Sequence, residues 1–181
     1  MQITPTALPD VLLLEPRVFG DARGHFFESF NARAFADATG REVVFVQDNQ
    51  SRSVRGVLRG LHYQVAQPQG KLVRVLSGEI FDVAVDLRRS SPTFGHWAGV
   101  RLSGENRRQI WIPEGFGHGF LVLSEVADVF YKTTDFYAPA HERSVTWNDA
   151  TLAIDWPLDG APILSAKDAA APRLEAAETF A

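Results

Sequence analysis

The feature of this sequence that most constrains its fold is a succession of short segments in which apolar and polar residues alternate. In the run EIFDVAVDL, every second residue from Phe81 to Leu87 is apolar and falls on one face of an extended chain, while Asp82 falls on the other. Similar segments, separated by Gly-, Pro- or Asn-containing turns, fill most of the chain. Many strands at close spacing predict an all-β sandwich or barrel.

Several turns between these strands are visible in the sequence. Ser77-Gly78-Glu79 separates two alternating runs and is expected to close a hairpin. A second turn is expected at SGEN, residues 103–106, and FLVLSEVADVFYKTTDFY at 120–137 supplies two more strands.

Only two stretches are typical of helices. SFNARAFADATG, residues 29–40, offers Ser29 and Asn31 as capping candidates and Gly40 as a stop. The Ala-rich tail from about 165 to 181 predicts one or two short helices interrupted at Pro172. Because the sequence shows no repeat, low-complexity segment or linker, we expect residues 1–181 to form a single domain with these helices at its periphery.

Composition excludes several classes of function. The formal net charge of −4 provides no overall basic field for nucleic acid, so an anionic ligand needs a local cluster of Arg and Lys. The absence of cysteine excludes disulfides, thiol catalysis and Cys-based zinc sites. The N-terminus lacks the pattern of a secretion signal, and the apolar runs are much shorter than the ~20 residues of a membrane span. We therefore expect a cytoplasmic protein that binds neither nucleic acid nor membranes.

Glycine-rich nucleotide motifs are also missing. GFGHGF, residues 115–120, is not GxGxxG because position 120 is Phe, and it lacks a βαβ context. No phosphate-binding P-loop is present either.

His62, in LRGLHYQ at residues 58–64, is the residue whose role the sequence must decide. It is compatible with a proton-transfer base, a metal ligand, or a core histidine whose hydrogen bonds are satisfied.

Two histidine-bearing segments narrow these alternatives. GLHYQ at 60–64, together with Pro113, Gly115 and His118 of IPEGFGHGF, resembles the two motifs of the cupin superfamily, small β-barrels that enclose a ligand cavity. Metal-binding cupins carry H-x-H in the first motif, where this chain has His62 and Gln64. Such a metal site usually needs three imidazoles, or imidazoles and a carboxylate, so we expect no metal.

A narrower resemblance covers almost the whole chain, from about Leu8 to about Leu174. It rests on eight blocks in order: FGDARGHFFES, FVQDNQS, VLRGLHYQ, QGKLVRV, SPTFG, WIPEGFGHGF, YKTTDFYAP and SAKDAAAP. These blocks resemble the dTDP-4-dehydrorhamnose 3,5-epimerase family. The resemblance implies a cupin-type jelly-roll β-barrel, a homodimer, and a cofactor-free isomerase. That enzyme converts dTDP-4-dehydro-6-deoxy-D-glucose to dTDP-4-dehydro-L-rhamnose in dTDP-L-rhamnose biosynthesis.

Epimerisation beside a ketone requires a base, a group that stabilises the enolate oxygen, and an acid on the opposite face. His62, with an ordinary pKa of about 6.5, suits the base, and the resemblance implies that Asp168 orients it. Lys71 is the candidate for stabilising the enolate, although by itself it is more typical of a solvated lysine at a strand start. Tyr131 is the candidate acid, because a phenol with a pKa of about 10 stays protonated at neutral pH.

The resemblance also implies substrate-binding residues. Gln47 and Asn49 lie two positions apart and would share a strand face. Glu142 and Lys167 are equally typical of a surface ion pair, and core packing is the alternative role of Tyr137. The implied set is Arg23, Glu28, Gln47, Asp48, Asn49, Arg59, Lys71, His118, Tyr137, Glu142 and Lys167.

Arg59 and His62 pose a geometric difficulty, because their odd spacing directs them to opposite faces of a regular strand. If both face one cavity, the chain must break its alternation, and we predict a bulge or turn at Gly60.

The sequence is also compatible with other functions. The nearest is a related nucleotide-sugar 3- or 5-epimerase or a ketoisomerase. A metal-dependent cupin oxygenase or isomerase and a non-catalytic nucleotide-sugar-binding cupin are the alternatives from other classes.

Overall fold

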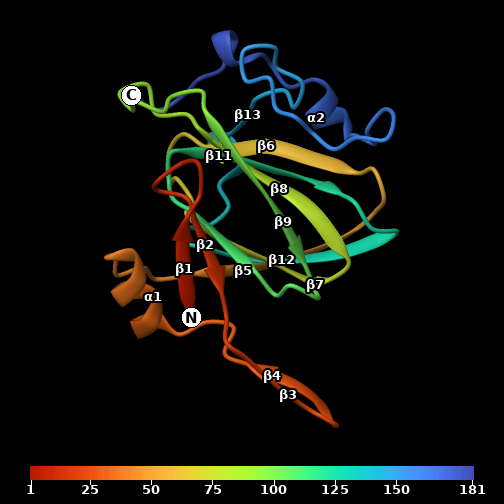
Figure 1. The fold of residues 1–181 in the computed structure, drawn as a ribbon. Coiled ribbons are helices and arrows are strands. Elements are labelled where there is room, and N and C mark those ends of the chain that lie inside the picture. The colour runs from red at the N-terminus through yellow and green to blue at the C-terminus, as the bar shows by residue number, and fades with distance from the viewer.

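The computed structural model describes residues 1–181, and most of its strands form two stacked antiparallel sheets (Figure 1). The first sheet contains, in spatial order, β1 (Gln2–Pro5), β2 (Leu12–Glu15), β10 (Gln109–Ile112), β7 (Lys71–Ser77), β12 (Val126–Thr133) and β5 (Gln47–Val54). The second contains β13 (Glu142–Ser144), β6 (Leu58–Gln64), β11 (Phe116–Val122), β8 (Glu79–Asp86) and β9 (Trp97–Ser103). This sandwich confirms the predicted all-β jelly-roll fold.

The expected hairpin at Ser77-Gly78-Glu79 is wrong. β7 and β8 belong to different sheets, so the chain crosses from one sheet to the other at Gly78. Gly78 has a φ of +79°, and a side chain there would collide with the Val126 carbonyl oxygen. The chain likewise changes sheets between β9 and β10 and between β11 and β12. Alternation shows which faces are buried, but it does not show which strands pair.

The two sheets enclose the main core, and the second sheet is covered on its other side as well. Ile80 and Ala84 of β8 point into the cluster between the sheets, whereas Val83 and Val85 pack against the C-terminal part of the chain. The alternation predicted around Phe81 is therefore confirmed, with both faces of β8 buried. In Figure 1 the C-terminal segment lies over the sheet that contains β6 and β11.

The helices lie at the periphery, as predicted. In α1 (Ala32–Thr39), the Asn31 side chain accepts a hydrogen bond from the Ala34 N–H, and Gly40 ends the helix with a φ of 67°. The tail holds α2 (Ala166–Ala169) and a 3-10 turn at Leu174–Ala176, and another 3-10 turn spans Pro139–His141. No helix combines the length and the apolar character that a bilayer crossing requires.

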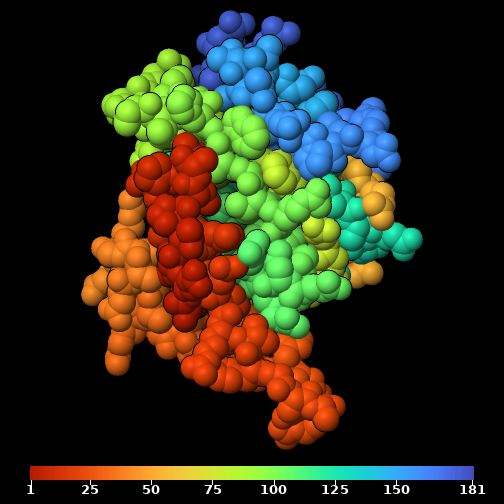
Figure 2. Space-filling view, in the orientation of Figure 1, coloured from red at the N-terminus to blue at the C-terminus, as the bar shows by residue number.

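A separate hairpin projects from the body of the protein (Figures 1 and 2). It is formed by β3 (Val18–Asp21) and β4 (Gly24–Phe27), which pair only with each other. Seven of its eight strand residues are exposed, and Phe26 is 70% exposed. An isolated two-stranded ribbon with an exposed aromatic ring gains little stability from its own chain.

Candidate active site

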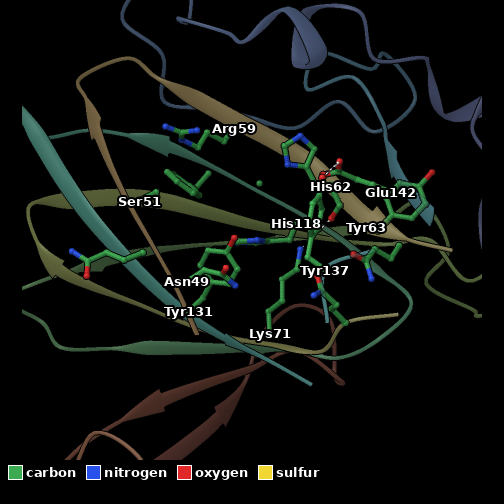
Figure 3. Close-up of a pocket in the computed structure, with 15 residues that line it drawn as sticks. Asn49, Ser51, Arg59, His62, Tyr63, Lys71, His118, Tyr131, Tyr137 and Glu142 are labelled. Carbon is green, nitrogen blue, oxygen red and sulfur yellow. Dashed lines mark hydrogen bonds between the residues drawn. The ribbon is translucent and has the colours of Figure 1, made fainter. Parts of the chain in front are cut away.

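A cavity of about 270 Å³ opens between the two sheets and is lined mainly by polar side chains (Figure 3). Strands β5, β7 and β12 contribute residues from one wall, and β6, β11 and β13 contribute residues from the other. Eight residues predicted from the sequence line it: Asn49, Arg59, His62, Lys71, His118, Tyr131, Tyr137 and Glu142. The fold therefore brings most of the predicted set into one site.

His62 is paired with a buried carboxylate. Its Nε2 lies 2.5 Å from Oδ1 of Asp168, which α2 carries behind the wall of the cavity. The Ser165 hydroxyl donates a 2.7 Å hydrogen bond to the other carboxylate oxygen. Burial by itself would raise the pKa of Asp168, but the hydrogen bonds from His62 and Ser165 outweigh it and lower this pKa below its ordinary value. Asp168 therefore remains ionised and fixes the orientation of the imidazole.

Lys71 is buried at the start of β7, so the solvated-lysine alternative is excluded. The side chain is 8% exposed, and Nζ donates a 3.3 Å hydrogen bond to the His62 carbonyl oxygen. Burial lowers the pKa of Lys71 to about 8, and the negative charge of Asp82 is the largest opposing effect. The structure thus holds an ammonium group of reduced pKa next to His62.

Tyr131 comes from the sheet opposite His62. It lies on β12 of the first sheet, and His62 lies on β6 of the second, so the two rings stand on facing walls of one cavity (Figure 3). Burial raises the pKa of Tyr131 above its ordinary value, against the lowering effect of the Arg59 charge. The phenol therefore remains protonated at neutral pH.

The backbone breaks its alternation at Gly60, as predicted. The pairing of β6 with β11 shifts register in this region, and Gly60 has a φ of 114°. A Cβ on Gly60 would lie 2.5 Å from the Gly119 Cα, so only glycine allows the two strands to approach this closely. Arg59 and His62 consequently both reach the cavity, and the Arg59 guanidinium donates to the Ser53 hydroxyl at 3.0 and 3.1 Å.

A hydrogen-bonded network surrounds the rim. Glu142 accepts from the Tyr137 hydroxyl at 2.9 Å and from Lys167 Nζ at 2.7 Å. Gln47 accepts from the Tyr137 backbone N–H at 3.0 Å and donates to the Asn49 side chain at 2.9 Å, which confirms that Gln47 and Asn49 share a face. Lys167 therefore belongs to this network, although it lies outside the cavity lining.

Three residues of the predicted binding set lie outside both the cavity lining and the rim network within their own chain. Asp48 lies on the opposite face of β5, where it forms a 2.7 Å ion pair with Lys132, because strand alternation separates it from its neighbours. Arg23 is exposed in the β3–β4 turn and pairs with Asp21. Glu28 follows the hairpin, is also exposed, and accepts a 3.2 Å hydrogen bond from Asn31.

Two kinds of residue were missed by the sequence analysis. Ser51 and Ser53 continue the every-second-residue series of Gln47 and Asn49 along β5, so alternation alone would have found them. Asp82 is buried inside the sandwich and accepts a 2.9 Å hydrogen bond from His118 Nε2. Its signal was a carboxylate between Ile80 and Ala84 on the inward face of the strand, a face that Asp86 shares farther along.

The side chain of Gln64, which occupies the place of a second metal-binding histidine, makes its hydrogen bonds to backbone groups. Its amide donates to the carbonyl oxygens of Gln67 (2.6 Å) and Phe136 (3.2 Å) and accepts from the Ala138 N–H (2.9 Å). The side chain thus ties two loops together. No group of three or more His, Asp or Glu side chains is arranged to hold a metal ion.

Comparisons with known proteins identify the family of this chain. The family profile described as dTDP-4-dehydrorhamnose 3,5-epimerase matches residues 5–176. The chain is 69% identical over 168 residues to the dTDP-4-dehydrorhamnose 3,5-epimerase of Pseudomonas aeruginosa, covering 93% of each, and 60% identical over 178 residues to that of Salmonella typhimurium, covering 98% of this chain and 97% of the relative.

A solved structure extends the likeness to three dimensions. The dTDP-6-deoxy-D-glucose-3,5-epimerase of Legionella pneumophila, in complex with dTDP-4-keto-L-rhamnose, is 57% identical and superposes with a TM-score of 0.95, covering 97% of this chain and 93% of that one. With the sequence profile, the curated relatives and the fold in agreement, this chain belongs to the dTDP-4-dehydrorhamnose 3,5-epimerase family.

Proposed function

We propose that the chain is the isomerase that converts dTDP-4-dehydro-6-deoxy-D-glucose to dTDP-4-dehydro-L-rhamnose, within dTDP-L-rhamnose biosynthesis. The observation that carries this proposal is the placement of His62 and Tyr131 on facing walls of one cavity, with buried Lys71 beside them. The names of the relatives support the same activity. We also propose that the enzyme acts in the cytoplasm, the location predicted from the sequence.

The chemistry follows from these three groups. His62, oriented by Asp168, removes the proton from the carbon next to the C4 ketone, and the C–H electron pair moves to the ketone oxygen to form an enolate. The Lys71 ammonium stabilises that oxygen. Tyr131 then protonates the same carbon from the opposite face, and solvent exchange restores His62 and Tyr131. One proton leaves and one returns at each of C3 and C5, so the steps balance without an oxidant or a reductant.

Turnover of the 4-keto-6-deoxy nucleotide sugar in heavy water, followed at C3 and C5 separately, tests the proposal. A 3,5-epimerase incorporates solvent deuterium at both carbons and forms the L-sugar, which a rhamnose-forming reductase then consumes. Deuterium at one carbon alone would assign the chain to a 3- or 5-epimerase instead. Absence of exchange at both carbons, with retained binding of the nucleotide, would favour a non-catalytic binder.

The pH dependence of kcat/KM is expected to reflect the ionisation of Lys71. Only the ammonium form stabilises an enolate, so activity is retained below the Lys71 pKa of about 8 and falls as the pH rises above it. The fall should be about tenfold per pH unit at higher pH. Stopped assays across this pH range measure the fall, which forms the upper limb of the kcat/KM profile. The residual activity of Lys71→Met should lack this upper limb. A limb near pH 10, the ordinary range for lysine, would contradict the assignment.

We also propose that the enzyme is a homodimer in which the β3–β4 hairpin of one copy completes the cavity of the other. The hairpin projects from the rest of its own chain (Figure 2). It exposes Phe19 and Phe26 and carries Arg23 in its turn. A second copy would cover this apolar surface, bring Arg23 to a substrate diphosphate and bring Glu28 to another polar part of the substrate. Focused positive charge is needed there, since the chain has a net charge of −4.

Mixing two inactive variants tests this sharing. Arg23→Ala and His62→Asn chains, co-expressed with different affinity tags, should form hybrid dimers with one intact site each. Equal random assembly should then restore about a quarter of wild-type activity. If Arg23 serves the cavity of its own chain, the hybrid contains no intact site and the mixture stays inactive. Light scattering that gives a monomer mass would also refute the proposal.

A further inference from the structure

Asp82 is a buried carboxylate that the reaction described above does not use. It lies on β8 with an exposed fraction of 0%, on the same inward face as Ile80 and Ala84 of the core. One carboxylate oxygen accepts the 2.9 Å hydrogen bond from His118, and the other oxygen has no hydrogen-bond partner. A carboxylate buried with half of its acceptor capacity unused is costly for folding. A role in the neighbouring cavity would account for its presence.

The surroundings of Asp82 differ from those of the other His–Asp pair. The Asp168 carboxylate is bound by His62 and by the Ser165 hydroxyl, and the Asp168 backbone N–H donates back to that hydroxyl, so its geometry is fixed on several sides. Asp82 has His118 as its single hydrogen-bonding partner. His118 and His62 occupy directly paired positions on β11 and β6, so the two imidazole–carboxylate pairs stand side by side.

Lys71 is the cation that Asp82 influences most directly. Lys71 is as deeply buried as His118, and its one hydrogen bond runs to a neutral carbonyl oxygen. Burial favours the neutral amine, and Asp82 is the strongest of the charges that favour the ammonium. The titratable groups that share this environment are Asp82 of β8, His118 of β11, His62 of β6, Tyr131 of β12, Glu142 of β13 and Lys167 of α2.

We propose that Asp82 is a positioning residue of the epimerase: it orients the His118 imidazole through Nε2 and keeps Lys71 charged inside the cavity. An ionised carboxylate only accepts hydrogen bonds, so it fixes His118 as a donor toward β8. Its negative charge also balances an ammonium that burial would otherwise neutralise near neutral pH. The inference rests on the proposed epimerase function, because the charged lysine is needed to stabilise an enolate.

The first test uses Asp82→Asn, which keeps the shape and removes the charge. Loss of the charge is expected to move the upper limb of the kcat/KM profile from about pH 8 to lower pH. A displacement of about one pH unit corresponds to a tenfold change in the ratio of ammonium to amine. The matched control is Asp86→Asn on the same strand, whose carboxylate is bound by Arg88, Ser91 and Thr93. That variant should lose stability but keep the wild-type limb.

The second test is independent of activity. The chain has three lysines, at positions 71, 132 and 167, so carbon-13 labelling of lysine gives three resolvable side-chain titrations by NMR. The signal of Lys71 should titrate near pH 8 in the wild-type enzyme and at lower pH in Asp82→Asn. If Asp82→Asn does not fold, Asp82→Ser, which also keeps a hydrogen-bond acceptor, takes its place.

The outcomes separate the two proposals. An unmoved Lys71 titration in the Asp82 variant, or unchanged or faster turnover at neutral pH, overturns the role of Asp82. Wild-type protein that fails to turn over the 4-keto sugar refutes the proposed function, and the lysine titration still decides whether Asp82 controls Lys71.

Discussion

His62→Asn is expected to lower kcat by about 10²–10⁴-fold, the usual contribution of a positioned general base. Asparagine keeps a polar side chain of similar size but cannot take up a proton. The Asp168 carboxylate, 2.5 Å from the imidazole in the native protein, would then face an amide that it can still hydrogen-bond. Deuterium exchange at both C3 and C5 should fall with kcat, because no proton leaves the substrate.

The affinity for dTDP distinguishes loss of the base from loss of the site. Calorimetry should give a dissociation constant within about twofold of the wild-type value, since binding common to ground state and transition state is untouched. His96→Asn, at an exposed histidine, is the matched control and should leave both quantities unchanged. A His62→Asn enzyme with more than a tenth of wild-type kcat would refute the role of the imidazole.

Tyr131→Phe is expected to separate proton removal from inversion. The variant retains the ring that packs against the core but lacks the hydroxyl that supplies a proton from the wall opposite His62. Net formation of the L-sugar should fall by about 10²–10⁴-fold. His62 can still remove a proton and return a deuteron on the same face, so deuterium enters the substrate with retained configuration. Mass spectrometry and proton NMR of the recovered sugar measure the two processes separately.

Tyr63→Phe provides the control for removal of a phenol. Tyr63 adjoins His62 on β6, but its side chain packs outside the sandwich, and its hydroxyl donates to the Glu178 carbonyl oxygen at 2.6 Å. Its loss should reduce stability and leave kcat unchanged. If exchange in Tyr131→Phe falls in parallel with inversion, Tyr131 does not act solely as the opposing acid.

Local features of the fold were predictable because they depend on neighbouring residues. The faces of β8 follow from alternation, α1 starts at its Asn31 cap and ends at Gly40, and the irregularity at Gly60 follows from the odd spacing of Arg59 and His62. The hairpin predicted at Ser77–Glu79 was wrong because strand pairing depends on residues that are distant in the sequence. The alternating sequence pattern of a strand is the same whether the next strand pairs with it or lies in the opposite sheet.

In the site, too, some features depend on neighbouring residues and others on residues that are distant in the sequence. By itself, the sequence determined the fold class, the family and many of the side chains that line the candidate site, because residue types and short spacings carry that information. Tertiary structure decided that Asp168, 106 positions from His62, reaches its imidazole. It also decided that Lys71 is buried, that Asp48 faces away, and that Asp82 stands behind His118. These facts depend on which strands the chain brings together across the sandwich, and burial and charge act on a group only through neighbours that are distant in sequence.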